Sequence, residues 1–106
     1  MATKTKAKGS IVGTTHSLPR WVDSRALGAG VAENYTIPTT IGYVIMSADN
    51  GFYFNTNGTA SVPGDLSDGS ASMYVPSSFE GVVDSSDVIS LFAVGATVVT
   101  IACYAD

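Results

Sequence analysis

The chain has 106 residues, 45% of them apolar and 13% charged, so it has the composition of one folded domain and not of a disordered chain. All five basic residues lie within the first 25 positions, where the net charge is +4, whereas residues 26–106 hold eight acids and no base. Binding of nucleic acid by the body is excluded on this ground, because nothing after Arg25 could neutralise a phosphate.

Residues 1–30 predict an extended N-terminal arm, followed by a body at residues 31–106. The first residues are small and basic, and Ser10–Thr15 suits a short strand. The rest of this stretch lacks the alternation of a strand, and Pro19 disfavours a helix through it, although one helical turn around Val22–Leu27 is an alternative.

The body carries strand patterns at close spacing. Ile41–Ser47 is apolar on both faces, which predicts a central strand. An Asn-Gly pair then predicts a turn at Ala48–Gly51, after which Phe52–Asn55 is expected to return as the partner strand. Further strands are expected at Val31–Ile37, Thr59–Val62, Ala71–Val75 and Phe79–Val83, with a loop at residues 63–70 and a turn at 84–87.

The last segment predicts a β-hairpin. Val88–Val94 and Thr97–Tyr104 flank Gly95 and Ala96, a pair that suits a type II′ turn. A membrane span is the alternative for these 17 residues, but they are too short and are interrupted by hydroxyl residues and glycine. In the second arm Val99, Ile101 and Cys103 are expected on one face, and Val98, Thr100, Ala102 and Tyr104 on the other.

Six to eight short strands with a turn every few residues predict an all-β fold. The expected architecture is an antiparallel β-sandwich or jelly-roll-like body, with the extended N-terminal arm outside it. The composition agrees, because the chain is rich in valine, isoleucine and threonine, whose branched side chains suit a pleated surface.

Catalytic chemistry is not expected. The single histidine, His16, lies in the predicted arm, and the single cysteine, Cys103, has no base nearby in the body to activate it. One cysteine also allows neither an internal disulfide nor a cysteine zinc cluster. Asp84 and Asp87 are the best pair of carboxylates for acid–base work, but they fall in a predicted turn. We therefore expect no enzyme, no catalytic residue and no cofactor.

Two further motifs are interpreted as structural. Asp65, Asp68 and Gly69 resemble part of a calcium loop, but the alternating acids and distal glutamate are missing, so a solvated turn is expected and not a metal site. A cation shared with a neighbouring subunit is the alternative. Glycosylation sequons occur at Asn34 and Asn57, but no secretion signal accompanies them, so we expect the protein to be made in a cytoplasm.

A partner-binding role is predicted for the basic arm. Trp21 lies beside an arginine, and aromatic residues next to arginines are common interface anchors. Packing of this tryptophan against the body's own core is an equal alternative. The predicted partner-binding residues are Lys4, Lys6, Lys8, Arg20, Trp21 and Arg25.

The body resembles a family of small β-sandwich virion proteins of tailed bacteriophages, over about residues 35–104. The similar pattern begins at YTIP and continues with an aromatic strand, FYF, before a V-P-x-D-x-x-D-G loop. It ends in an apolar segment, VISLFAVGATVVTIACY, with a tyrosine near the C-terminus.

This resemblance implies a structural virion protein, a capsid decoration or cement protein that binds the head surface as a homotrimer or other homo-oligomer. The implied partners are the major capsid protein and other copies of the chain, with no nucleic acid and no membrane, and the implied location is the virion head surface. Two alternatives stay open: another virion component at the head–tail junction or tail tip, and a carbohydrate-binding module. The aromatic residues that could bind a glycan are Tyr43, Phe52, Tyr53, Phe54 and Tyr74.

Overall fold

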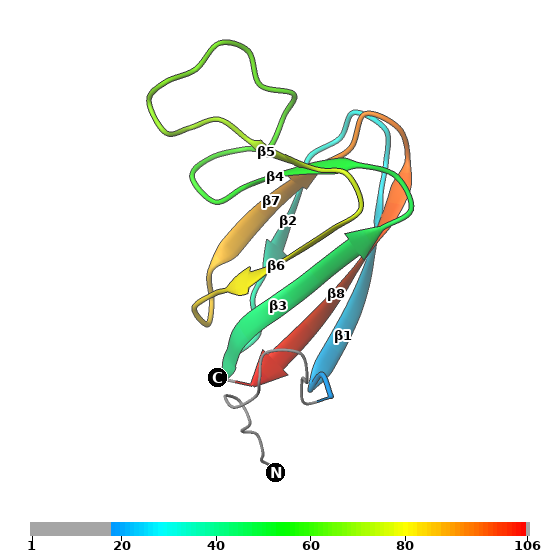
Figure 1. Cartoon of the computed structure of the whole chain (residues 1–106), viewed down its shortest axis with the longest axis vertical. Helices are drawn as coiled ribbons and strands as arrows, with labels where there is room; N and C mark the ends of the chain where they lie inside the picture. Colours follow the sequence, from blue (N-terminus) through cyan, green and yellow to red (C-terminus); the bar gives the residue numbers. More distant parts are fainter. Residues whose placement is uncertain (1–17, 106) are drawn as a thin grey trace.

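The computed structural model describes residues 18–105, which form eight strands and no helix (Figure 1). The strands are β1 (Trp21–Leu27), β2 (Glu33–Thr36), β3 (Ile41–Ala48), β4 (Phe52–Asn55), β5 (Met73–Val75), β6 (Ser78–Val82), β7 (Val88–Phe92) and β8 (Thr97–Ala105). They make two four-stranded antiparallel sheets, which we call the β1 sheet, with the order β1-β8-β3-β6, and the β2 sheet, with the order β2-β7-β4-β5. The prediction of an all-β antiparallel sandwich is confirmed.

The strand pairing follows a nested pattern. The first strand pairs with the last, the second with the second to last, the third with β6 and the fourth with β5. Two further ladders, β3 with β8 and β4 with β7, complete the sheets. The chain changes sheet at every connection except the one from β4 to β5. The fold is therefore a long antiparallel ribbon bent over on itself.

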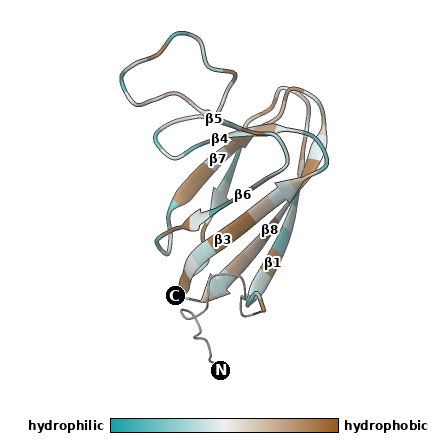
Figure 2. Cartoon of the chain, viewed as in Figure 1, coloured by the Kyte–Doolittle hydropathy of each residue, from teal (hydrophilic) through white to brown (hydrophobic). Residues whose placement is uncertain are grey.

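The core lies between the two sheets and follows from the period-two alternation of the strands. Along β8 from Thr97 to Tyr104 the odd-numbered side chains are buried and the even-numbered ones are more exposed, as the sequence predicted for Val98–Tyr104. Figure 2 shows apolar segments along β3 and β7, which belong to the two different sheets. The most deeply buried large side chains are Phe52, Leu27, Ile37, Ile41, Met46, Leu91 and Ile101.

Both predicted hairpins are wrong. β4 does not pair with β3, and β8 does not pair with β7, because each connection crosses to the opposite sheet. Gly95 is outside the set of positive-φ residues within 18–105, so it lacks the conformation that a type II′ turn needs. Short turn-forming segments can reverse a chain within one sheet or carry it across a sandwich, and local sequence does not distinguish these outcomes.

The strand predicted at Thr59–Val62 is also absent from the structure. This segment belongs to the long connection between β4 and β5, which is held by side chains of the β2 sheet instead of by a ladder. The backbone N–H of Ala60 donates to Ser90 Oγ at 2.9 Å, and Asn55 Nδ2 donates to the carbonyl of Ser70 at 2.8 Å. These bonds fix the base of the loop, whose tip projects from the sandwich (Figure 1).

The predicted boundary at residue 30 does not separate an arm from the body. Trp21–Leu27 is β1, a full strand of the β1 sheet paired with β8, so neither an extended arm nor a helical turn describes it. The hydropathy of this segment does not alternate as in a typical strand, because the inward face of this edge strand carries Trp21, Asp23 and Arg25 before the apolar Leu27. The predictions for residues 1–17, including the strand at Ser10–Thr15, lie outside the described residues.

These inward polar groups are paired along the open side of the sandwich between β1 and β2. Arg25 forms a 2.6 Å ion pair with Glu33, and Asp23 accepts hydrogen bonds from the Tyr35 hydroxyl at 2.6 Å and from Trp21 Nε1 at 2.8 Å. Burial, followed by the bond to Asp23, raises the pKa of Tyr35 well above its ordinary value. Inward-pointing charges are one way in which edge strands avoid pairing with other chains.

Candidate interaction surface

The outer face of the β1 sheet is open to solvent and almost free of charge. On β8 the residues opposite the buried ones point outward, and the cross-strand register extends this face to β1, β3 and β6. We call it the outer β1-sheet face. It consists of Val22, Ser24, Ala26, Tyr43, Ile45, Ser47, Ser78, Glu80, Val82, Val98, Thr100, Ala102 and Tyr104.

Large apolar side chains are exposed on this face. Val82 is 84% exposed, Val22 56% and Val98 46%. A hollow of about 220 Å³ lies at one end, lined by Ser47, Ala48, Asp49, Val98 and Thr100. A broad apolar surface suits contact with another folded surface better than capture of a small molecule.

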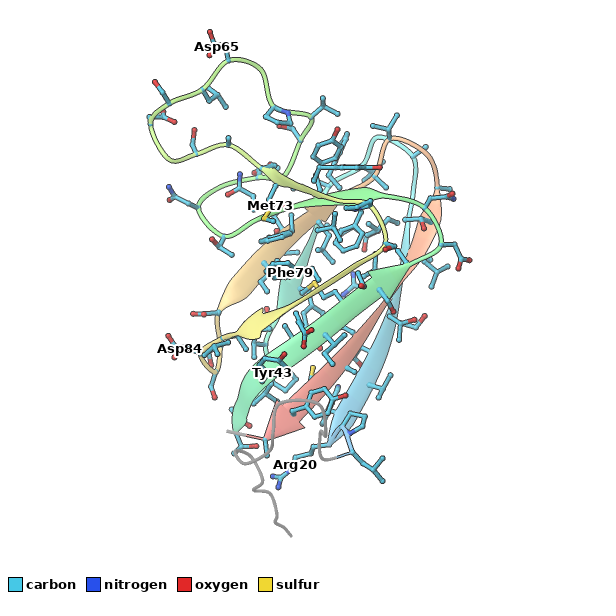
Figure 3. All side chains as sticks on the ribbon, viewed as in Figure 1. Arg20, Tyr43, Asp65, Met73, Phe79 and Asp84 are labelled. Atoms are coloured by element: carbon cyan, nitrogen blue, oxygen red, sulfur yellow. The ribbon has the colours of Figure 1, made fainter. Side chains whose placement is uncertain are left out.

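Among the paired strand residues of the face only Glu80 is charged, and Asp49, directly after β3, lines the hollow at one end. Glu80 lies on β6, at one margin, and accepts a hydrogen bond from the Tyr43 hydroxyl. Arg20, directly before β1, lies at the opposite margin, where its backbone N–H donates to the carbonyl of Cys103 at 2.8 Å (Figure 3). Depletion of charge together with half-buried tyrosines and exposed aliphatic side chains is the composition of an interface core.

The two tyrosines of the face are coupled to Glu80. The hydrogen bond to Glu80, followed by burial, raises the pKa of Tyr43 to about 12. Tyr104 meets Tyr43 edge to face, with ring centroids 5.9 Å apart, and its pKa is raised by burial and by the charge of Glu80. The neutral phenol is thus the form that the folded protein stabilises.

This bond predicts a loss of stability in alkali. The folded Tyr43 keeps its proton up to about pH 12, whereas an unfolded tyrosine loses it near pH 10, so the free energy of unfolding should fall as the pH rises between these values. Urea denaturation at several alkaline pH values measures the fall. In Tyr43→Phe the fall should be smaller, and an unchanged pH dependence in that variant would contradict the assignment.

The residues predicted to form one partner-binding arm do not form a single group in the structure. Trp21 and Arg25 are strand residues bonded to Asp23 and Glu33, so they are held within the sandwich edge. Trp21 nevertheless remains half exposed, which makes it partly a cap of the fold and partly a surface residue. Lys4, Lys6, Lys8 and His16 lie outside the described residues.

The carboxylates singled out in loops serve local structure. Asp68 Oδ1 accepts hydrogen bonds from the hydroxyl and the backbone N–H of Ser70, which lower the pKa of this carboxyl. Asp87 Oδ2 accepts from the backbone N–H of Asp84 and closes the predicted turn. Within residues 18–105 no three potential metal-ligating side chains are grouped together.

The aromatic residues proposed for a glycan are divided among three places. Phe52 is buried in the core, Phe54 packs against Phe79 between the sheets, and Tyr43 lies on the outer β1-sheet face. Tyr53 and Tyr74 remain together on the outer face of the β2 sheet, with ring centroids 5.0 Å apart.

A third ring, which sequence reasoning missed, joins this pair. Phe92 lies beside Tyr53 with centroids 6.5 Å apart, because β7 and β4 are neighbours in the β2 sheet. Tyr74 covers Gly51, where a Cβ atom would lie 2.0 Å from the tyrosine hydroxyl oxygen. A larger residue at position 51 would therefore require the Tyr74 ring to move.

The outer β1-sheet face was also missed as a candidate site. Its signal was present in the uncharged outward series Val98, Thr100, Ala102 and Tyr104, but its extent depends on strands that are distant in sequence. A scan against protein-family models and searches of curated proteins and of solved structures found no match to this chain. Residues 18–105 contain no helix long and apolar enough to cross a membrane.

Proposed function

We propose that the chain is a structural virion protein of a tailed bacteriophage, a capsid decoration protein that binds the head surface as a homo-oligomer and stabilises the shell. The observation that carries the proposal is the broad outer β1-sheet face, which has few charges on an otherwise acidic body. A protein whose task is assembly needs such a surface, since apolar area is removed from water when it is covered.

The strand order supports the finer assignment of the fold as a jelly roll. The first strand pairs with the last, and the second pairs with the second to last. This nested pairing of eight strands in two sheets is what the rolling up of a single antiparallel ribbon produces. Jelly rolls occur in viral capsid proteins and in lectins, so the architecture is compatible with both candidate functions and decides neither.

Contact with the shell is assigned to the basic residues before β1. Lys4, Lys6 and Lys8 precede a region, residues 18–105, that holds two arginines and eight acids. One of those arginines is already paired with Glu33. The three lysines are therefore the positive charges best suited to an acidic patch on a capsid protein.

Mixing the full-length protein with undecorated phage heads tests this role. The wild type is expected to bind in many copies per head, and Lys4→Glu/Lys6→Glu/Lys8→Glu to bind at least about tenfold more weakly because like charges would meet. Val62→Glu/Leu66→Glu/Ser67→Glu, which adds three acids at exposed positions of the long loop, is the control with a charge change of the same sign. Unchanged binding of the triple variant would refute the assignment of shell contact to the lysines.

The copy number in the virion distinguishes this proposal from the alternative of a head–tail or tail-tip component. Decoration of a head surface requires hundreds of copies in a virion, whereas a connector or tip needs about a dozen or fewer. A quantitative gel of purified virions distinguishes the two, and a low copy number would exclude decoration.

A glycan-binding role is the second candidate, and the ring group Tyr53, Tyr74 and Phe92 is what favours it. Tyr74 is 52% exposed, so a ring face is accessible to a sugar. The rings are tilted by 51° and 58° to one another and make no flat platform. Binding on a glycan array that is lost in Tyr74→Ala would support this role, and an array without binding would remove it.

A further inference from the structure

We propose that two copies of the chain pair through their outer β1-sheet faces, about a twofold axis parallel to the strands. This pairing names the contact within the homo-oligomer proposed above and rests on that proposal. Of the eight carboxylates within residues 18–105, Glu80 lies on this face and Asp49 lies at its end, so most of the acidic charge of the two bodies stays outside the contact.

The positions of the two marginal charges select the symmetry. Glu80 is on β6 and Arg20 precedes β1, and these strands form opposite edges of the β1 sheet. Cross-strand partners form rows that run across the four strands. Glu80 lies in the row that contains Val22, and Arg20, one residue before β1, continues the register in the next row, which contains Tyr43 and Val82. The two residues are therefore one row apart along the strands.

A twofold axis parallel to the strands places β1 of one copy over β6 of the other. Arg20 of each copy then faces Val82 of the second copy and lies within reach of its Glu80, which makes two equivalent ion pairs. An axis across the strands would place Arg20 over the far end of β1, near Ala26, whereas the carboxylate at that end, Asp49, follows β3 on the other side of β8. Charge complementarity therefore favours the axis along the strands.

The apolar rows fit the same arrangement. In the centre of the stack β8 lies over β3, so Ala102 meets Ile45, and Thr100 meets Ser47 of the second copy. Small side chains on β8 opposite a larger one on β3 allow the two sheets to approach at the spacing of stacked sheets, about 10 Å. The exposed Val22 and Val82 lie toward the margins and would be covered.

The test is sedimentation equilibrium of the full-length protein over a wide range of concentration, without phage heads. The wild type is expected to form dimers. Arg20→Glu and Glu80→Arg should each weaken the dimer about tenfold or more, and Arg20→Glu/Glu80→Arg should restore it to within about threefold of the wild type. Only a contact between copies of this chain predicts that restoration.

Val82 provides a second test that does not depend on Glu80. Its side chain is 84% exposed, so substitution should leave the fold intact, as circular dichroism would check. Because Val82 faces Arg20 of the second copy, Val82→Lys should weaken the dimer about tenfold more than Val82→Asp does. Asp65→Lys, at the tip of the long loop and away from the face, is the control (Figure 3).

The outcomes separate this pairing from the virion role. A monomer at all concentrations, a trimer insensitive to the charge reversals, or a double variant that is not restored would overturn the pairing. Dimers with the expected response that fail to bind phage heads would leave the pairing in place and refute decoration. Head binding by a protein that stays monomeric would do the reverse.

Discussion

Replacing Phe52 by alanine is expected to lower the free energy of unfolding by about 3–5 kcal/mol, the cost of emptying a large buried aromatic site. Phe52 is 0% exposed and belongs to the core cluster between the sheets. A domain of this size is stabilised by about 5–15 kcal/mol in total. The variant should therefore unfold at a much lower urea concentration, which a denaturation curve followed by circular dichroism would measure.

Tyr53→Ala is the matched control for this loss. The neighbouring tyrosine points to the other side of β4 and contacts Tyr74 and Phe92 on the outer face. Its removal is expected to cost about 1–2 kcal/mol, the worth of those ring contacts. Equal losses in the two variants would show that the assigned orientation of β4 is wrong.

Deleting residues 1–25 is expected to abolish cooperative folding, whereas deleting residues 1–17 should preserve it. The longer deletion removes most of β1 and leaves β8, which carries the fully buried Val99, Ile101 and Cys103, as an uncovered edge. It also removes Asp23, which accepts the hydrogen bond of the buried Tyr35 hydroxyl. An exposed apolar edge strand is a site of aggregation.

Thermal unfolding and size-exclusion chromatography of the two truncated proteins measure this difference. The shorter deletion retains all eight strands and serves as the control. A cooperative, monodisperse protein lacking residues 1–25 would show that β1 is dispensable and that the sandwich closes without it.

Most strands could be predicted from local sequence, and the reason is the period-two alternation of half-buried strands. β3, β5, β6 and β7 each lie within or close to a predicted strand, and the odd-even division of β8 is confirmed by burial. β1 was not predicted as a strand because its inward positions hold the charged residues Asp23 and Arg25. These side chains are satisfied by partners on β2, eight and twelve residues away, so alternation of hydropathy alone was uninformative.

The sequence shows correctly where the basic residues end, but the end of the basic residues does not coincide with a structural boundary. The bases do end at Arg25, but this position lies inside β1 and is neutralised by Glu33. What remains before the described sandwich is the group of three lysines. The outer β1-sheet face, in contrast, has no contiguous signature, because its rows combine β1, β8, β3 and β6.

By itself the sequence determined that this protein is built from short antiparallel strands, which side of most strands is apolar, and that the bases precede an acidic body. The tertiary structure alone decided which sheet each strand joins and therefore which outward residues share a face. The physical reason is that alternation and turn residues act over a few positions, whereas ladders such as β1 with β8 join the two ends of the chain. The candidate interaction surface is a product of those distant pairings.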